Sequence, residues 1–233
     1  MSKSFSNWVE NKTNMKTPER VCVIMRSISG GGKSFTAREM LKKYGGGDPN
    51  EHIFNTDDYF IWDIKQELQK KELAGEEIDH QFYDELMLDT YRKNWSGSRL
   101  RAAHKWNFDR FQAALNQWMT PLVVDNTNLS VWEMKNYVEA AEKAGYKIII
   151  QEPTSPWWQD HVHMLSDKSR YGKELEEFAH FLAGYHEGMT KKYGVTGNTH
   201  GVPLDSIRNQ IRRWQPNIKT ADDVMGRTDK KGH

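Results

Sequence analysis

A glycine-rich run near the amino end of the chain has residue types and spacing suited to binding phosphate. Residues 27–34 read Ser-Ile-Ser-Gly-Gly-Gly-Lys-Ser. Consecutive glycines let backbone N–H groups point at phosphate oxygens without Cβ clashes, beside the start of a helix. In this pattern Lys33 reaches the β- and γ-phosphates of ATP and the Ser34 hydroxyl binds Mg²⁺. We therefore predict a nucleotide site formed by Ser29, Gly30, Gly31, Gly32, Lys33, Ser34 and Phe35.

The run departs from the usual phosphate-binding pattern at its first position, where Ser27 replaces glycine. The alternative interpretation is a glycine-rich turn between a strand and a helix, with Lys33 as a surface lysine. An apolar strand before the run and a helical pattern after it favour phosphate binding.

A pair of carboxylates follows the second predicted strand, in the sequence Asn55-Thr56-Asp57-Asp58. A hydroxyl that attacks phosphorus is activated by a carboxylate that accepts its proton. We predict Asp57 as this general base. The alternative is an Asx-turn or a helix cap, for which Asp58 is the better candidate, although we also count Asp58 among the acceptor-binding residues.

Another acid, Asp125, follows the apolar residues Leu122-Val123-Val124. An Asp in this position binds Mg²⁺ in many phosphate-loop enzymes, directly or through water. The alternative is that Asp125 ties loops together by hydrogen bonds with Asn126 and Asn128. We expect Ser34 and Asp125 to form the Mg²⁺ site.

The elements that must position these side chains alternate between strand and helix. We predict strands at 21–25, 52–55, 122–124 and 146–150, and a helix over 33–44 that ends at three glycines. Ser130 and Glu133 predict a capping box before another helix. This order predicts an α/β fold with a parallel sheet of four or five strands and helices on both faces. In such a sheet the ligand lies at the carboxyl ends of the strands.

Composition agrees with one globular domain. The chain has 233 residues, 33 Lys and Arg against 32 Asp and Glu, and a single cysteine, Cys22. Its longest apolar stretches are far shorter than the roughly 20 residues of a membrane helix, so we expect no membrane partner. The polar amino end does not predict a secretory signal, and the lone cysteine suits the reducing cytoplasm. Oligomeric state stays open.

Charge is distributed unevenly along the chain. Between Asp57 and Asp89 there are eleven acids and three lysines, whereas the next segment is basic. We predict that Arg99, Arg101, His104 and Lys105 contact a phosphate backbone, while Trp106 and Phe108 stack on bases or pack in the core. The helical spacing of the aromatic residues favours the core.

Several blocks of sequence resemble the kinase domain of polynucleotide 5′-hydroxyl kinases and related viral kinases that act on DNA. The matching blocks are 26–34, 55–60, 103–107, 124–128, 132–135, 152–153 and 200–203, so the resemblance spans most of 21–214. It implies a P-loop kinase fold over 1–233, with a core at about 18–216, a helical lid at about 157–200 and polar arms at the ends. It also implies ATP and Mg²⁺ as ligands and Asp57 as the base. We expect nucleic acid as the acceptor, with DNA favoured over RNA, although the sequence does not decide between them.

Two departures from this family concern the acceptor and the lid. The family has an arginine shortly after the Asp pair, where this chain has Phe60. Its lid arginines precede the segment that matches Val202-Pro203, where residues 197–200 carry none. Because phosphoryl transfer needs positive charge near the γ-phosphate, another cation must replace them. We expect Arg170 or Lys173, with Arg208 or Arg212 in reserve.

These features predict an ATP-dependent kinase that phosphorylates a hydroxyl of nucleic acid, with a polynucleotide 5′-hydroxyl as the first expectation. One alternative is a viral kinase acting on the hydroxymethyl group of 5-hydroxymethyluracil in DNA. The same residues would also suit a kinase of a nucleoside, sugar or different small alcohol, or an ATP-binding module without transfer activity.

Overall fold

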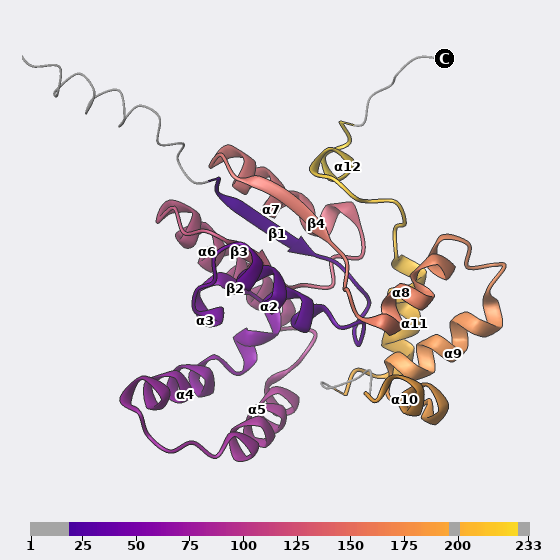
Figure 1. Ribbon diagram of the computed structural model, residues 1–233, viewed down its shortest axis with the longest axis horizontal. Helices are drawn as coiled ribbons and strands as arrows, with labels where there is room; N and C mark the ends of the chain where they lie inside the picture. Colours follow the sequence, from indigo (N-terminus) through magenta and orange to yellow (C-terminus); the bar gives the residue numbers. More distant parts are fainter. Residues whose placement is uncertain (1–18, 196–200, 228–233) are drawn as a thin grey trace, which may run out of the picture.

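A parallel sheet forms the centre of the computed structural model, which describes residues 19–195 and 201–227. The sheet has four strands in the order β2-β3-β1-β4, and every neighbouring pair is parallel (Figure 1). The strands are β1 (Val21–Met25), β2 (Ile53–Phe54), β3 (Leu122–Val124) and β4 (Lys147–Gln151). β1 lies between two neighbours and all its residues are buried, which explains its uninterrupted apolar sequence.

The helices of the described part follow the expected alternation with strands. In chain order they are α2 (Lys33–Lys43), α3 (Pro49–His52), the 3₁₀ turn η1 (Thr56–Phe60), α4 (Trp62–Ala74), α5 (His80–Asn94), α6 (Leu100–Asn116), α7 (Val131–Lys143), α8 (Pro156–His161), the 3₁₀ turn η2 (Val162–Ser166), α9 (Gly172–Leu182), α10 (Glu187–Tyr193), α11 (Leu204–Arg213) and α12 (Ala221–Met225).

Different helices cover the two faces of the sheet. Val21, Val23 and Met25 point to one face and pack with α2. Cys22 and Ile24 point to the other face and pack with residues of α6, α7 and α12. The period of two in a strand places these sets on opposite faces. The predicted α/β fold, with a parallel sheet flanked by helices, is thereby confirmed.

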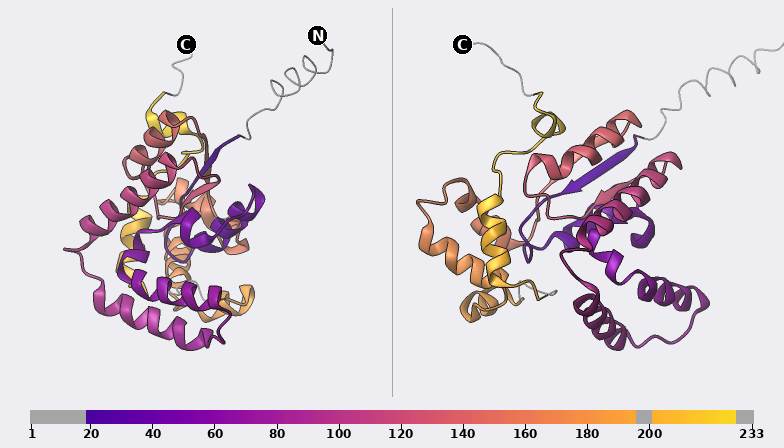
Figure 2. Two further views of the ribbon diagram at one scale, coloured as in Figure 1. Left: turned by 90° about the vertical axis from the view of Figure 1, so that its left-hand side faces the viewer. Right: turned by 180° about the vertical axis from the view of Figure 1, so that it is seen from behind.

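A second packed unit, made of α8, η2, α9, α10 and α11, lies beyond the carboxyl ends of β1 and β4 (Figures 1 and 2). Its core includes Trp158, Phe178 and Ile207, and it continues into the phosphate-loop segment through Ile28. The glycine-rich segment at this edge of the sheet is therefore bordered by helices from the part of the chain that we predicted as a lid.

Helices α4 and α5 form an arm that projects from the body of the molecule (Figure 1). No residue of α4 is buried, and in α5 only Tyr83 is. The Tyr83 hydroxyl donates a hydrogen bond to Glu67 Oε1 at 2.9 Å, which joins the two helices. No helix among residues 19–195 and 201–227 has both the length and the apolar character needed to cross a bilayer.

The predicted capping box at the start of α7 does not form. Ser130 is the N-cap residue, but its side chain makes no capping hydrogen bond. Its hydroxyl donates to Glu133 Oε1 at 3.2 Å, while Glu133 Oε2 accepts from the N–H of Leu129 at 3.0 Å. Glu133 also pairs with Arg213 of α11. A tertiary contact from the end of the chain thus competes with the local motif.

The packed part of the chain extends past residue 216, where we expected a polar arm to begin. Ile218 and Val224 are buried in the core beside α7. Helix α12 starts with a true capping box, in which Thr220 and Asp223 bond each other's backbone N–H groups. The remaining parts of the expected arms, 1–18 and 228–233, lie outside the described residues.

Candidate functional site

The glycine-rich loop joins β1 to α2 and has the backbone of a phosphate cradle. Gly30 and Gly32 have φ values of 80° and 93°, in the left-handed region that favours glycine. Gly32 is the N-cap residue of α2. The N–H groups of the first helical turn, at Lys33, Ser34 and Phe35, therefore have no partner within the helix. The Phe35 side chain is 62% exposed, so we expect the predicted contact of this residue with phosphate to come from its backbone N–H.

Ser27 fits the first position of the loop because it packs beneath the glycines. It is fully buried, and its hydroxyl donates to the carbonyl of Ile28 at 2.6 Å. Its N–H donates to the carbonyl of Thr127 at 2.8 Å. A Cβ at Gly31 would lie 2.2 Å from Ser27 Oγ. The serine thus occupies space that only a glycine at position 31 leaves open.

Trp157 of α8 and Ser155, the N-cap residue of α8, donate hydrogen bonds to two backbone carbonyls of the phosphate loop. Trp157 Nε1 donates to the carbonyl of Gly30 at 3.1 Å, and Ser155 Oγ donates to that of Gly31 at 2.7 Å. Because these two carbonyls point toward the helical unit, the hydrogen bonds hold the loop on the side opposite its N–H groups. Sequence reasoning missed both contacts, because Trp157 lies 127 residues from Gly30 in the chain.

Gln210 of α11 braces the start of the loop. Its Oε1 accepts from the N–H of Ser29 at 2.8 Å, and its Nε2 donates to Ser29 Oγ at 3.1 Å. Ser29, which we predicted as a nucleotide contact, therefore has both its N–H and its hydroxyl engaged by the protein. In this structure Ser29 connects the phosphate loop to α11.

Asp125 lies beneath the loop, at the end of β3, and is 3% exposed. Its N–H donates to the carbonyl of Phe54 at 2.9 Å. Its Oδ1 atom is buried and accepts no hydrogen bond from the described residues. Burial raises the pKa of the Asp125 carboxyl above its ordinary value, while the Lys33 ammonium and the Ser34 hydroxyl oppose that rise. Asp125, Lys33 and Ser34 are therefore neighbours.

This donor set fits Mg²⁺. The ion prefers oxygen ligands and commonly binds through one or two protein groups together with phosphates. One buried carboxylate oxygen of Asp125, which has no hydrogen-bond partner among the described residues, lies near the Ser34 hydroxyl. The described residues contain no group of three or more His, Cys, Asp and Glu side chains that would hold a metal without phosphates.

The asparagines beside Asp125 perform the loop-tying role that we had considered for the acid itself. Asn126 Oδ1 accepts from the N–H and the hydroxyl of Thr56, at 3.0 and 2.9 Å. Asn128 Nδ2 donates to the carbonyl of Met25 at 2.7 Å. Asp125 is thus left available for another partner.

Asp57 lies on η1, which follows β2 at the same edge of the sheet. The turn is capped by Asn55, whose Oδ1 accepts from the N–H of Asp57 at 2.8 Å, and Asp58 is not the cap. The hydroxyl of Tyr91, on α5, donates to Asp57 Oδ1 at 3.1 Å. The negative charge of Asp57 contributes to the raised pKa of Asp125. The predicted base and the predicted metal ligand are thus within electrostatic reach of each other.

Asp58 also lies within electrostatic reach of Asp125, but its carboxylate is engaged by a lysine of α4. It is 6% exposed and pairs with Lys65 of α4 at 2.6 Å. The contact fixes the first turns of α4 against η1. The structure therefore gives Asp58, which we had counted among acceptor-binding residues, an ion pair within the protein.

Of the four basic residues that we predicted to bind the acceptor, two contact η1 and two are exposed on α6. The Arg99 guanidinium lies 5.3 Å from the ring centroid of Tyr59 and 5.5 Å from that of Phe60. His104 Nδ1 lies 3.3 Å from the hydroxyl of Thr56. Both side chains therefore contact η1, close to Asp57. The remaining two, Arg101 and Lys105, are exposed on α6, where Lys105 pairs with Asp109 at 2.6 Å.

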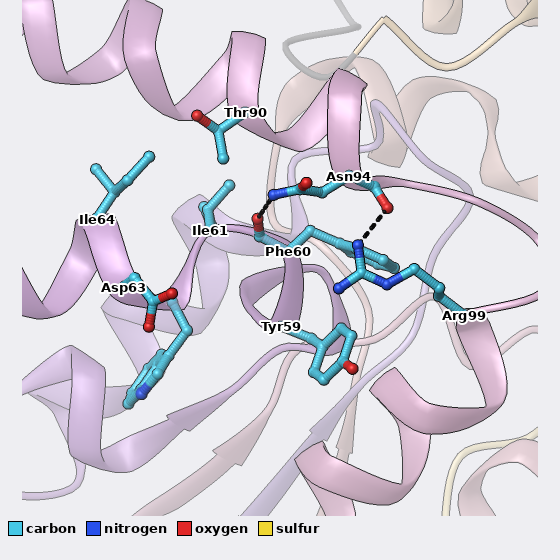
Figure 3. A pocket seen from close by; sticks show the side chains of 9 residues that line it. Tyr59, Phe60, Ile61, Asp63, Ile64, Thr90, Asn94 and Arg99 are labelled. Atoms are coloured by element: carbon cyan, nitrogen blue, oxygen red, sulfur yellow. Dashed lines mark hydrogen bonds between the residues drawn. The ribbon is translucent and has the colours of Figure 1, made fainter.

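A cavity of about 130 Å³ opens beside Arg99 (Figure 3). Arg99 Nη1 donates to the carbonyl of Asn94 at 2.9 Å, and Asn94 Nδ2 donates to that of Phe60 at 3.0 Å. Residues of η1, α4 and α5 line it: Tyr59, Phe60, Ile61, Trp62, Asp63, Ile64, Thr90, Asn94 and Arg99.

The aromatic residues of α6 pack inside the protein, as their spacing favoured. Phe108 stacks on Phe111, at 6.3 Å between ring centroids, and belongs to the border of the main core. Trp106 is partly buried between Tyr59 and Trp62, with centroid distances of 5.7 and 5.2 Å.

The cations that we proposed for the lid have partners elsewhere. Arg170 is exposed, and its guanidinium lies 5.2 Å from the ring centroid of the adjacent Tyr171. Lys173 is exposed and 4.0 Å from Glu177. Arg208 pairs with Glu176 and with Asp205. Arg212 donates to Asn209. Residues 197–200, which carry no arginine, lie outside the described residues.

Arg92, a cation of the basic segment that we had not assigned to the site, lies close to the residues that precede α11. Arg92 of α5 approaches Gly201 so closely that a Cβ there would lie 3.4 Å from Arg92 Nη2. Among residues 19–195 and 201–227, no carboxylate forms an ion pair with Arg92. Tyr91, which bonds the predicted base, precedes it in the chain.

Regions of known proteins are similar in sequence to this chain. A family model described as an AAA domain (AAA_33) matches residues 23–177. Human NEDD4-binding protein 2 is 31% identical over 165 residues, which cover 71% of this chain and 8% of that protein. Human YLP motif-containing protein 1 is 27% identical over 143 residues, covering 58% of this chain and 6% of that protein.

The chain spans less than a tenth of the length of these two relatives. The region that the family model matches, residues 23–177, contains the glycine-rich loop, η1 and the end of β3, and so includes the residues of the predicted phosphate site. The chain belongs to the AAA_33 family, a kinase-like family of P-loop nucleotide-binding domains.

Proposed function

We propose that this protein transfers the γ-phosphate of ATP to a hydroxyl group of nucleic acid, with the 5′-hydroxyl of DNA as the first acceptor. The observation that carries the proposal is the meeting of four side chains at one sheet edge. Lys33, Ser34 and Asp57 all contribute to the electrostatic surroundings of Asp125. A phosphate-binding lysine, a hydroxyl and two carboxylates are the groups that phosphoryl transfer requires.

In the proposed reaction, Asp57 accepts the proton of the acceptor hydroxyl. The hydroxyl oxygen forms a bond to the γ-phosphorus while the bond from that phosphorus to the β,γ-bridging oxygen breaks. The products are a phosphate ester and ADP, and the proton passes from Asp57 to solvent. Lys33 places positive charge at the phosphates, and Ser34 and Asp125 would hold Mg²⁺. When bound, Mg²⁺ neutralises charge on the phosphate oxygens.

Arg99 supports a nucleic-acid acceptor. The family that this sequence resembles has an arginine at the position of Phe60, and here the Arg99 guanidinium lies over the Phe60 ring. We propose that Arg99, the N-cap residue of α6, supplies the missing charge, assisted by His104. We also propose that the exposed Arg101 and Lys105 contact phosphates further along the nucleic-acid strand. We also propose the cytoplasm as the compartment, since the lone Cys22 forms no internal disulfide.

A direct assay distinguishes the acceptors. The full chain is incubated with γ-labelled ATP and Mg²⁺, and with 5′-hydroxyl DNA, 5′-hydroxyl RNA, duplex DNA containing 5-hydroxymethyluracil, or small alcohols. We expect label at the 5′ end of DNA and none with Lys33→Ala. Label on the modified base alone would support the viral-type alternative, and label on small alcohols alone would exclude a nucleic-acid acceptor. Bound ATP without transfer to any acceptor would indicate a non-catalytic module.

A further inference from the structure

Helix α5 reaches the predicted base through one side chain. The hydroxyl of Tyr91 donates to Asp57 Oδ1 at 3.1 Å. The Tyr91 ring stands edge-on to the Phe60 ring, with centroids 5.7 Å apart and an interplanar angle of 89°. Tyr91 is partly buried, so its ring is fixed by packing as well as by the hydrogen bond.

The Tyr91 hydroxyl is a permanent donor. Burial, followed by the charge of Asp57 and the hydrogen bond to it, raises the pKa of Tyr91 far above its ordinary value. The hydroxyl therefore keeps its proton throughout the pH range in which a carboxylate acts as a base.

A general base works only if one of its oxygens faces the proton that it accepts. The backbone of Asp57 is fixed by Asn55, but this contact leaves the carboxylate free to rotate. The Tyr91 hydrogen bond occupies Oδ1 and thereby sets that rotation. Oδ2 is then the oxygen that remains for the acceptor hydroxyl.

The same helix holds η1 at a second point. Asn94, which lies almost one turn after Tyr91, donates to the carbonyl of Phe60 at 3.0 Å. The two bonds join the last turn of α5 to both ends of the segment between Asp57 and Phe60. Tyr91 therefore acts from a helix that is firmly attached to the turn carrying the base.

We propose that Tyr91 is a positioning residue for the transfer reaction, which holds the Asp57 carboxylate so that Oδ2 faces the acceptor hydroxyl. The proposal rests on the proposed function, since it concerns the same base. It gives the α4–α5 arm a role in the chemistry although most of the arm is exposed.

The test compares two tyrosines of α5. Tyr91→Phe removes the hydroxyl that bonds Asp57, whereas Tyr83→Phe removes a similar bond to Glu67, in the arm. We expect Tyr91→Phe to lower kcat by about tenfold to hundredfold, as misplacement of a reacting group does, with an unchanged KM for ATP. Tyr83→Phe should leave kcat within about twofold of wild type, because the hydroxyl that it removes bonds Glu67 within the arm and not the turn that carries Asp57.

A double variant separates positioning from a structural effect. Adding Tyr91→Phe to Asp57→Asn should cause no further loss, since Tyr91 acts through Asp57.

Equal kcat values for Tyr91→Phe and Tyr83→Phe, or an additive loss in the double variant, would overturn the role of Tyr91 while leaving the proposed function in place. A wild-type protein that labels no acceptor would overturn both proposals.

Discussion

Single residues decide how this phosphate loop departs from the usual pattern. Ser27 replaces a glycine, and the structure accommodates it because its hydroxyl bonds the carbonyl of Ile28 beneath the loop. As a consequence, position 31 has no room for a side chain. A Cβ at Gly31 would lie 2.2 Å from Ser27 Oγ and 2.8 Å from the Trp158 ring. The departure is therefore compatible with a working cradle.

Gly31→Ala should destabilise the protein by about 1–3 kcal/mol, the usual effect of overpacking a filled site, and should weaken ATP binding. Adding Ser27→Gly should restore part of the loss, because it removes the nearest clashing atom but leaves Trp158 in place. Gly97→Ala is the matched control, since nothing lies within 4 Å of a Cβ there. Urea unfolding and calorimetric ATP titration measure both effects. Equal stabilities for the Gly31 and Gly97 variants would contradict this account.

Asp125 gives the free protein a specific pH dependence. Because burial raises its pKa above the ordinary value of 3.8, the folded protein holds this proton more tightly than the unfolded chain. The protonated Asp125 carboxyl therefore contributes its full stabilisation of the folded protein below pH 3.8, and this contribution is lost as pH rises through the raised pKa. Between the pKa of the unfolded chain and that of the folded protein, the free energy of unfolding falls by about 1.4 kcal/mol for each pH unit.

Asp125→Asn cannot ionise, so the variant should become more stable relative to wild type as pH rises above about 4. Urea unfolding without nucleotide or Mg²⁺, in steps from pH 4 to neutral, measures the difference. If the free energies of unfolding of the two proteins changed with pH in parallel, the Asp125 carboxyl would not have the raised pKa that its burial predicts. In the presence of Mg²⁺ and ATP the order should reverse, because the variant loses a ligand oxygen.

At the scale of elements, strands and the loop between them could be predicted from sequence, but the helices that complete the site could not. β1 and β3 have the predicted bounds because a buried parallel strand needs an unbroken apolar run. The glycine spacing likewise predicts the cradle. Tyr91, by contrast, lies 34 residues from Asp57, and only the path of the α4–α5 arm brings them together.

We propose that Arg92, in the arm, is the cation that sequence reasoning sought in the lid. Arg92 leaves α5 toward Gly201, whereas Arg208 and Lys173 of the helical unit lie beside acids. Arg92→Ala should therefore lower the transfer rate at least about tenfold, since a cation at the transferring phosphoryl group contributes several kcal/mol in related reactions. Lys93→Ala, an exposed cation one residue further along the same helix, is the control. Equal transfer rates for the two variants would exclude Arg92 from the site.

At the scale of the whole molecule, Arg26 connects the sheet to the end of the chain. Its side chain is fully buried and donates to the carbonyls of Ile218 and Gln215 at 3.0 and 2.6 Å. Its guanidinium lies 3.9 Å from the Trp214 ring centroid and 3.7 Å from Glu152. Burial lowers the pKa of Arg26 to about 10, and Glu152 opposes that change, so the side chain is charged at neutral pH. The sequence alone did not predict these contacts of Arg26, because its partners lie in distant segments of the chain.

Arg26→Leu should lower the free energy of unfolding by about 3–5 kcal/mol, the usual loss when one partner of a buried ion pair is removed. Lys219→Ala, which removes the exposed partner of the same Glu152, should cost at most about 1 kcal/mol. Urea unfolding of both variants tests the difference. Similar losses would mean that the C-terminal segment is held by different contacts.

The central claim is that Asp57 takes the proton of an acceptor hydroxyl beside ATP held by Lys33 and Ser34. Its most direct test is the rate of label transfer from γ-labelled ATP by Asp57→Asn, with ATP affinity measured in parallel. The account predicts a loss of about 10²–10⁴-fold in transfer, as for removal of a general base, with an affinity close to wild type. Transfer at the wild-type rate would contradict it.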